Sequence, residues 1–150
     1  MIHYRNDVRR SGVDGRALVS TARRLLGAVG ESGALSLTLV GDEAIRALNR
    51  DYRGKDAPTD VLSFPMDGPK MPAPGERLLG DVVISVETAR RQAADYDAPL
   101  QHEIYRLLIH GLLHLMGHDH VLAAQRRAME LQERRLAEAI ALPWPYAANA

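Results

Sequence analysis

The chain contains 150 residues, with 19 basic and 19 acidic side chains that give a formal net charge of zero, and it has no cysteine. This length predicts one domain with its own hydrophobic core, and the lack of cysteine excludes disulfide bonds, thiolate metal ligands and cysteine catalysis. A net charge of zero argues against tight non-specific wrapping of nucleic acid, since that affinity rests on basic side chains that neutralise phosphates. It is compatible with a modest RNA-binding surface.

The first half of the chain predicts strands and helices in alternation, followed by a pair of strands. An initial strand precedes a helix over residues 17–29, where apolar residues recur near helical spacing. Residues 35–40 alternate as a strand does, and an aspartate that can cap a helix begins a short helix over residues 42–49. Two further strands are expected over residues 61–64 and 79–85.

Helices are expected to fill the remainder of the chain, over residues 86–96, 99–116 and 121–142. The last of them ends before Pro143 and Pro145, because proline cannot continue a helix.

Residues 1–150 are expected to form a single domain of the α+β class, with a small mixed β-sheet packed against helices. The N-terminal residues do not resemble a signal peptide, and no apolar segment is long enough to cross a membrane. We therefore expect no membrane contact and a cytoplasmic location.

A cluster of histidines lies in the eleven residues that begin at His110 and end at His120. His110 and His114 are one helical turn apart on one face, so they can bind the same ion. Gly117 can take the left-handed conformation that ends a helix, which would bring His120 towards them as a third ligand. His118 is assigned as a neighbour, because a continuous helix would spread ligands at positions 110, 114 and 118 over about 12 Å, too far for Zn–N bonds of about 2.1 Å.

Three neutral imidazoles leave a fourth position open for water or substrate, which is typical of a catalytic zinc ion. We predict one zinc ion, although nickel, copper and iron also suit imidazole ligands. The spacing H-x-x-x-H-x-x-G-x-x-H is that of the metzincin zinc peptidases, whose glutamate after the first histidine serves as a general base. That position is Gly111 here, so the helix is zinc-hydrolase-like but lacks the base for amide hydrolysis.

A second segment begins with a predicted turn that carries Arg53 and Lys55 around Gly54, ahead of the short apolar strand at residues 61–64. Together with the Leu-Gly-Asp-Val-Val-Ile sequence of residues 79–84 and the histidine cluster, this segment closely resembles the YbeY family of bacterial endoribonucleases. The resemblance covers the middle and C-terminal two thirds of the chain. It implies a single-strand-specific metallo-endoribonuclease that acts in rRNA processing, at the 3′ end of the small-subunit rRNA, and in ribosome quality control.

The resemblance also implies site residues and partners. The family's metal ligands fall on His110, His114 and His120, and its important arginine falls on Arg53. His118 occupies a position where the family commonly has an aromatic residue. The implied partners are single-stranded RNA, rRNA, the ribosome and ribosomal proteins, and we expect no DNA partner.

Phosphodiester chemistry suits such a site, because a metal ion can polarise a phosphoryl oxygen and an arginine can bind two phosphate oxygens at once. We therefore predict Arg53 as a catalytic, phosphate-binding residue and Lys55 as a further substrate-binding residue. Asp119 either orients a ligand imidazole or caps the helix that follows His120. His118 would add a titratable group near the metal.

Two other functions share these features. An atypical zinc peptidase would need its general base from elsewhere, and Asp81 and Asp119 are the candidates. A non-catalytic ribosome-binding factor would use the metal for structure alone, with a closed fourth position, and would bind RNA without cutting it. Cleavage of RNA rather than casein separates the first alternative from the nuclease, and binding without turnover would identify the second.

Overall fold

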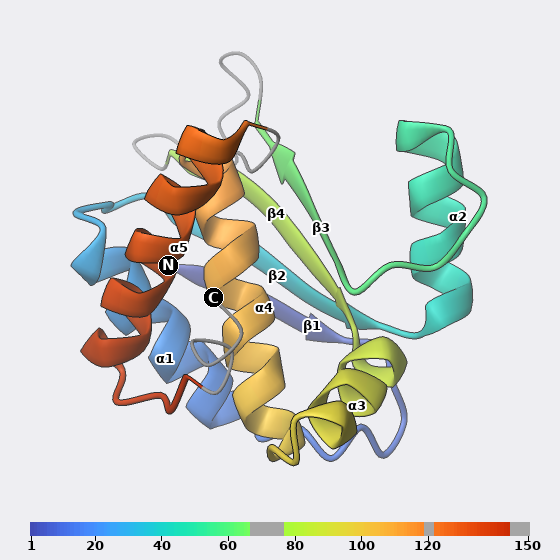
Figure 1. Cartoon of the computed structure of the whole chain (residues 1–150). Coiled ribbons are helices and arrows are strands. Elements are labelled where there is room, and N and C mark those ends of the chain that lie inside the picture. Colours follow the sequence, from blue (N-terminus) through green and yellow to red (C-terminus); the bar gives the residue numbers. More distant parts are fainter. Residues whose placement is uncertain (67–76, 119–121, 145–150) are drawn as a thin grey trace.

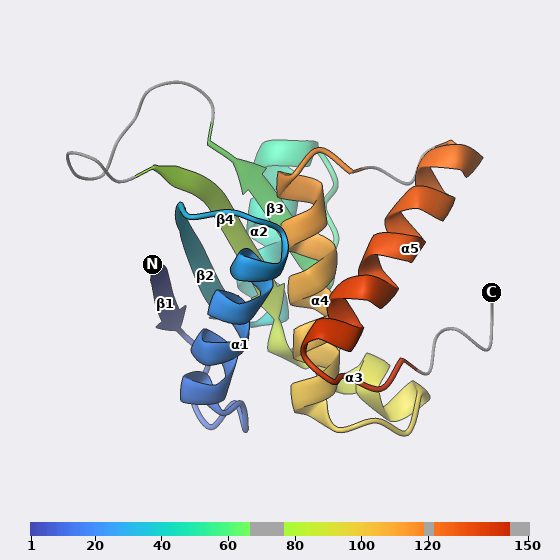
Figure 2. The same cartoon turned by 90° about the vertical axis from the view of Figure 1, so that its left-hand side faces the viewer.

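The computed structural model describes residues 1–66, 77–118 and 122–144 (Figures 1 and 2). These described residues form four strands and five helices. In chain order the elements are β1 (Ile2–Asn6), α1 (Gly15–Ala28), β2 (Ala34–Val40), α2 (Asp42–Arg53), β3 (Val61–Pro65), β4 (Leu78–Ser85), α3 (Val86–Asp95), α4 (Leu100–Leu115) and α5 (Ala123–Ala139). Their order is the one that the sequence predicts.

The four strands form one mixed sheet in the order β1-β2-β4-β3. β1 runs parallel to β2 and β2 parallel to β4, whereas β3 pairs with β4 in the antiparallel direction. β3 therefore lies at one edge of the sheet, where Ser63 is opposite Val82 and Phe64 is opposite Asp81. This arrangement confirms the predicted α+β fold with a mixed sheet.

Helices pack on both faces of the sheet, but they bury unequal amounts of it. Leu35, Leu37 and Leu39 alternate along β2 and are fully buried in the larger core, which α1, α4 and α5 complete. The opposite face packs against α2 through a small cluster around Ile45 and Val83. Figure 1 shows α4 on one side of β3 and β4 and α2 on the other, and Figure 2 shows α1, α4 and α5 together on one side of the sheet.

The central helix α4 is buried along most of its length, with side chains such as Leu108 at zero exposure. It ends at Leu115, after which Gly117 takes a φ of +92°. The backbone N–H of His118 donates to the carbonyl oxygen of Leu113 at 3.0 Å, the bond that closes a Schellman motif. The helix end predicted at Gly117 is confirmed.

Several element boundaries differ from the prediction, most clearly those of α2 and α5. α2 continues past residue 49 to Arg53, which was expected in a turn, because Gly54 takes a φ of +71° and its N–H donates to the carbonyl oxygen of Arg50, which closes the last turn. Residue 121, the predicted start of the last helix, lies outside the described residues, and α5 begins at Ala123 and ends at Ala139, three residues before the predicted end. Within the described ranges, none of the helices has both the length and the apolar character needed to span a membrane.

Candidate active site

His110 and His114 lie on one face of α4, and the Nε2 atoms of their two rings lie close to each other. The two Nε2 atoms are 3.1 Å apart, and the ring planes are inclined at 77°. A tetrahedral ion with Zn–N bonds of about 2.1 Å holds two ligand nitrogens about 3.4 Å apart. The spacing of this pair therefore fits a shared metal ion, and both side chains are half-buried, so the face that they form is accessible.

The remaining predicted members of the histidine cluster are only partly described. His120 and Asp119 lie outside the described residues. Among the residues that the structure does describe, no group of three possible metal-ligating side chains is present. A three-histidine ligand set stays a prediction.

His118 is half-buried and lines a cavity of about 210 Å³ between α1, α4 and α5. Gln132 and Arg135 are among the other residues that line it.

Gly111, which stands where a metzincin has its glutamate, faces the sheet at very short range. A Cβ atom added at Gly111 would lie 2.8 Å from Val82 Cγ1, 3.1 Å from Ser63 Oγ and 3.2 Å from Val61 Cγ2. Contacts this short leave no room for any side chain without movement of β3, β4 or α4. The missing glutamate thus has a physical cause, because the position that would carry a general base is filled by the sheet.

A buried carboxylate of α5, which was not among the predicted site residues, lies beside the histidine pair. Glu133 is 9% exposed, and its Oε2 atom is 3.6 Å from His110 Nδ1. The sequence contains a signal for it, because Met129, Leu136 and Ala137 form an apolar helical stripe in which Glu133 is the polar exception.

Arg53 and Lys55 lie on the other side of the edge strand from the histidine pair. Arg53 is the last residue of α2, Lys55 follows the αL residue Gly54, and both side chains are exposed. Because α2 and α4 pack on opposite faces of the sheet (Figure 1), the end of α2, where Arg53 lies, is across the sheet from the helix that carries the histidines. The ring of Tyr52 packs edge-on against Phe64 of β3, with centroids 5.3 Å apart, which holds the end of α2 on this strand.

The arginines of α2 differ in their charge partners. Arg46 pairs with Asp56 and Arg50 pairs with Asp51, at 2.8 Å and 3.0 Å. Within the described part of the chain, Arg53 makes no salt bridge. Arg53 therefore differs from Arg46 and Arg50: its guanidinium can bind a phosphate without competition from a carboxylate among the described residues.

Asp81, a candidate base for a peptidase, points away from the histidine pair. It is opposite Phe64 in the β3–β4 register, and directly opposite side chains lie on the same face of a sheet. Phe64 packs in the cluster beneath α2, as does Val83, which shares a face with Asp81 along β4. Asp81 therefore lies on the α2 face, across the sheet from α4.

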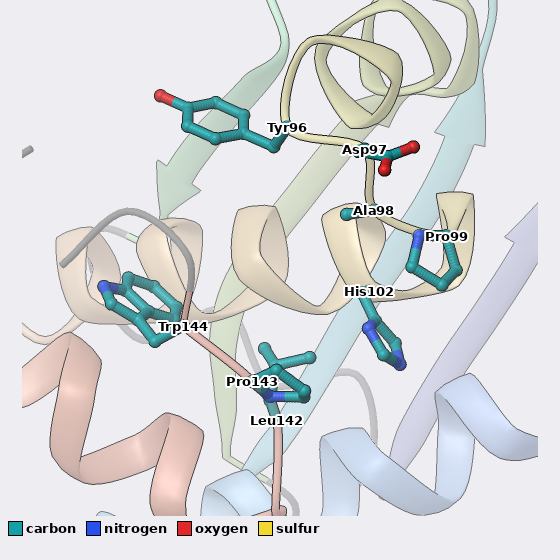
Figure 3. Close-up of a pocket in the computed structure, with 8 residues that line it drawn as sticks. All are labelled: Tyr96, Asp97, Ala98, Pro99, His102, Leu142, Pro143 and Trp144. Atoms are coloured by element: carbon teal, nitrogen blue, oxygen red, sulfur yellow. The ribbon is translucent and has the colours of Figure 1, made fainter. Parts of the chain in front are cut away.

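A separate cavity of about 500 Å³ lies at the beginning of α4, at the opposite end of this helix from His114 (Figure 3). The loop before α4 and the segment after α5 form its walls, which comprise Tyr96, Asp97, Ala98, Pro99, His102, Leu142, Pro143 and Trp144. Its lining includes none of the predicted site residues that the structure describes, so this cavity is separate from the candidate active site.

The chain has clear relatives among known proteins. The family model described as Endoribonuclease YbeY matches residues 5–141. An Endoribonuclease YbeY of Moorella thermoacetica is 47% identical over 141 residues, which span 85% of this chain and 90% of the relative. One of Halorhodospira halophila is 44% identical over 118 residues, which span 78% of this chain and 77% of the relative. The solution structure of a Thermotoga maritima protein aligns with a TM-score of 0.62 at 25% identity and covers 93% of this chain and 89% of that one.

Proposed function

Since the chain belongs to the YbeY family of endoribonucleases, we propose that it is a metal-dependent endoribonuclease that cleaves single-stranded RNA and uses one zinc ion held by His110, His114 and His120. The observation that carries the proposal is the 3.1 Å separation of the His110 and His114 Nε2 atoms on one face of α4. Family membership supports the nuclease activity and the RNA substrate, and the histidine geometry supports the metal.

The residues of this chain have distinct tasks in that reaction. The imidazoles would hold the ion, which when bound would polarise a phosphoryl oxygen and provide hydroxide near neutral pH. Arg53 would bind the phosphate through its planar guanidinium and stabilise the negative charge that develops during cleavage. Lys55 would add a second positive charge for the neighbouring backbone.

A substrate that contacts both parts of this site has to cross the edge strand β3, since Arg53 and the histidines lie on its two sides. A single RNA strand can bend over such an edge, whereas an RNA duplex is stiffer and wider. This geometry supports specificity for single-stranded RNA. Base stacking on the exposed ring of Tyr52, which is 70% exposed beside Arg53, would favour the same substrate.

We assign the protein to rRNA processing, with maturation of the 3′ end of the small-subunit rRNA as its reaction and ribosome quality control as its wider role. This role rests on the family alone. It would make the ribosome and ribosomal proteins its partners, and it would place the protein in the cytoplasm, where those partners assemble.

The peptidase alternative has less support. Gly111 packs against the sheet where a glutamate base would be needed, and Asp81 lies on the other face. A direct test offers the purified zinc-loaded protein three substrates: a labelled single-stranded RNA, the same RNA in a duplex, and casein. We expect cleavage of the single strand, much slower cleavage of the duplex and no cleavage of casein. Cleavage of casein but not RNA would overturn the proposal, and RNA binding without cleavage would identify a binding factor instead.

A further inference from the structure

Glu133 is a carboxylate in a position that usually holds an apolar side chain. It lies on α5 between the buried residues Met129 and Leu136, and it is 9% exposed. A carboxylate at such a site loses most of its hydration, which is unfavourable unless a positive or hydrogen-donating partner compensates. The structure places one candidate for that partner beside it, the imidazole of His110 on α4.

The two nitrogens of the His110 ring meet different neighbours. Nδ1 lies 3.6 Å from Glu133 Oε2, and Nε2 lies 3.1 Å from His114 Nε2. An ionised carboxylate only accepts hydrogen bonds, so it favours the tautomer with the proton on Nδ1. In that tautomer the Nε2 atom of His110 keeps its lone pair, on the side of the ring where His114 Nε2 lies.

We propose that Glu133 is a positioning residue for the metal site, which holds His110 in the Nδ1-protonated tautomer and orients its Nε2 atom towards the ion. This inference rests on the proposed metal site. The 3.6 Å separation exceeds a hydrogen bond, and we expect it to shorten to hydrogen-bond length when the ion is bound. Carboxylates that hold a ligand histidine in this way raise its basicity and strengthen metal binding.

A purely structural role for Glu133 makes a different prediction. If the contact with His110 only joined α5 to α4, its loss would lower the stability of the metal-free protein and leave zinc affinity unchanged. A positioning role changes zinc affinity even in a variant that keeps its fold. The two roles are therefore separated by metal affinity and ring tautomer, measured beside the thermal unfolding of the metal-free protein.

The experiment compares the wild-type chain with Glu133→Ala, Glu133→Gln and the control Glu130→Gln, which alters an exposed carboxylate of the same helix. Zinc affinity is measured by competition with a chromophoric chelator. We expect binding to weaken by about 10- to 100-fold in Glu133→Ala. The loss in Glu133→Gln should be smaller, since its amide oxygen can still accept from Nδ1, and Glu130→Gln should match wild type.

Nuclear magnetic resonance of the ring nitrogens gives a second readout. In the metal-free wild type we expect His110 to be protonated at Nδ1, and in Glu133→Ala we expect the population to move towards the Nε2-protonated form. Equal zinc affinity in wild type and Glu133→Ala, with an unchanged tautomer, would overturn the inference and leave the proposed function intact. A wild-type protein that binds no zinc would overturn the proposed metal site and, with it, the role of Glu133.

Discussion

The Oγ atom of Ser63 donates a hydrogen bond of 2.8 Å to the carbonyl oxygen of Gly111. Ser63 is on the edge strand β3, and Gly111 is on α4 between the two histidines of the pair, so the bond joins the edge of the sheet to α4. Both residues are buried. The close approach of strand and helix requires a glycine at position 111, and it fixes the histidine face relative to β3.

We expect Gly111→Ala to destabilise the fold by about 1–3 kcal/mol, because the new methyl group would overpack the interface with Val82 and Ser63. The control is Gly27→Ala in α1, where an added Cβ meets nothing within 4 Å. Alanine should stabilise that helix by up to about 1 kcal/mol. Urea unfolding measures both changes, and stabilisation by both variants would contradict the close packing at Gly111.

Arg53→Ala should lower RNA cleavage by about 100- to 1000-fold if its guanidinium stabilises charge at the reacting phosphate. Zinc content and the free energy of unfolding should not change, since the side chain is exposed. Arg50→Ala is the matched control, because Arg50 lies in the same turn of α2 but pairs with Asp51. Single-turnover cleavage at saturating RNA measures the effect. Equal rates in the Arg53 and Arg50 variants would remove Arg53 from the mechanism.

Asp42 joins the beginnings of α2 and α3 and should make the fold sensitive to acid. Its carboxylate accepts hydrogen bonds from Ser85 and Thr88, both at 2.6 Å, and pairs with Arg91 at 2.9 Å. Partial burial raises the pKa of this carboxyl, but the hydrogen bonds from Ser85, Thr88 and Arg91 outweigh burial and hold the pKa below its ordinary value.

A pKa that is lower in the folded state than its unfolded value of about 3.9 contributes stability above that pH, and this stability is lost as the pH falls through the folded pKa. Asp42→Asn should therefore lower the free energy of unfolding by about 1–2 kcal/mol at neutral pH and by less at about pH 2. Denaturant unfolding between these pH values measures the difference, with Asp51→Asn as an exposed control. If the free energies of unfolding of wild type and Asp42→Asn differed by the same amount at both pH values, the lowered pKa of Asp42 would be contradicted.

Glu103 and Arg106 form an ion pair inside the α4 interface. Glu103 has zero exposure, and its carboxylate accepts from Arg106 Nη2 at 2.7 Å. Arg106 also donates to Gln92 at 3.4 Å, and Gln92 donates to Asp60 at 3.2 Å, immediately before β3. These contacts connect the residue before the edge strand β3 with α4.

Glu103→Ala should destabilise the protein by about 3–5 kcal/mol, because it removes one member of a buried ion pair and keeps the charge of the other. The double variant Glu103→Leu with Arg106→Leu should lose less stability than the single one, since both charges are then replaced by apolar side chains. Guanidinium unfolding of the three proteins tests this. A double variant that is less stable than Glu103→Ala would show that the ion pair itself, rather than the cost of removing one member, dominates.

Features set by local spacing could be predicted from the sequence. The order of the elements follows from apolar periodicity, and the end of α4 follows from Gly117, because both depend on neighbouring residues. The pairing of His110 with His114 has the same origin, since one helical turn fixes their separation. The comparisons confirm the family that three short segments suggested.

Features that depend on contacts between distant segments could not be predicted. Glu133 reaches His110 only because α5 packs beside α4, and no spacing within either helix contains that information. The face of Asp81 depends on its pairing with Phe64 across the sheet, and the tight fit of Gly111 depends on β3.

The central claim is that His110 and His114 hold a metal ion that RNA cleavage requires. The most direct test measures cleavage of a labelled single-stranded RNA by wild type, by wild type with a chelator, by the same sample after zinc is restored, and by His114→Ala and His102→Ala purified identically. His102 lies on the same helix, at its other end. Cleavage should disappear with the chelator and in His114→Ala, return with zinc, and persist in His102→Ala. Equal cleavage by wild type and His114→Ala would contradict the claim.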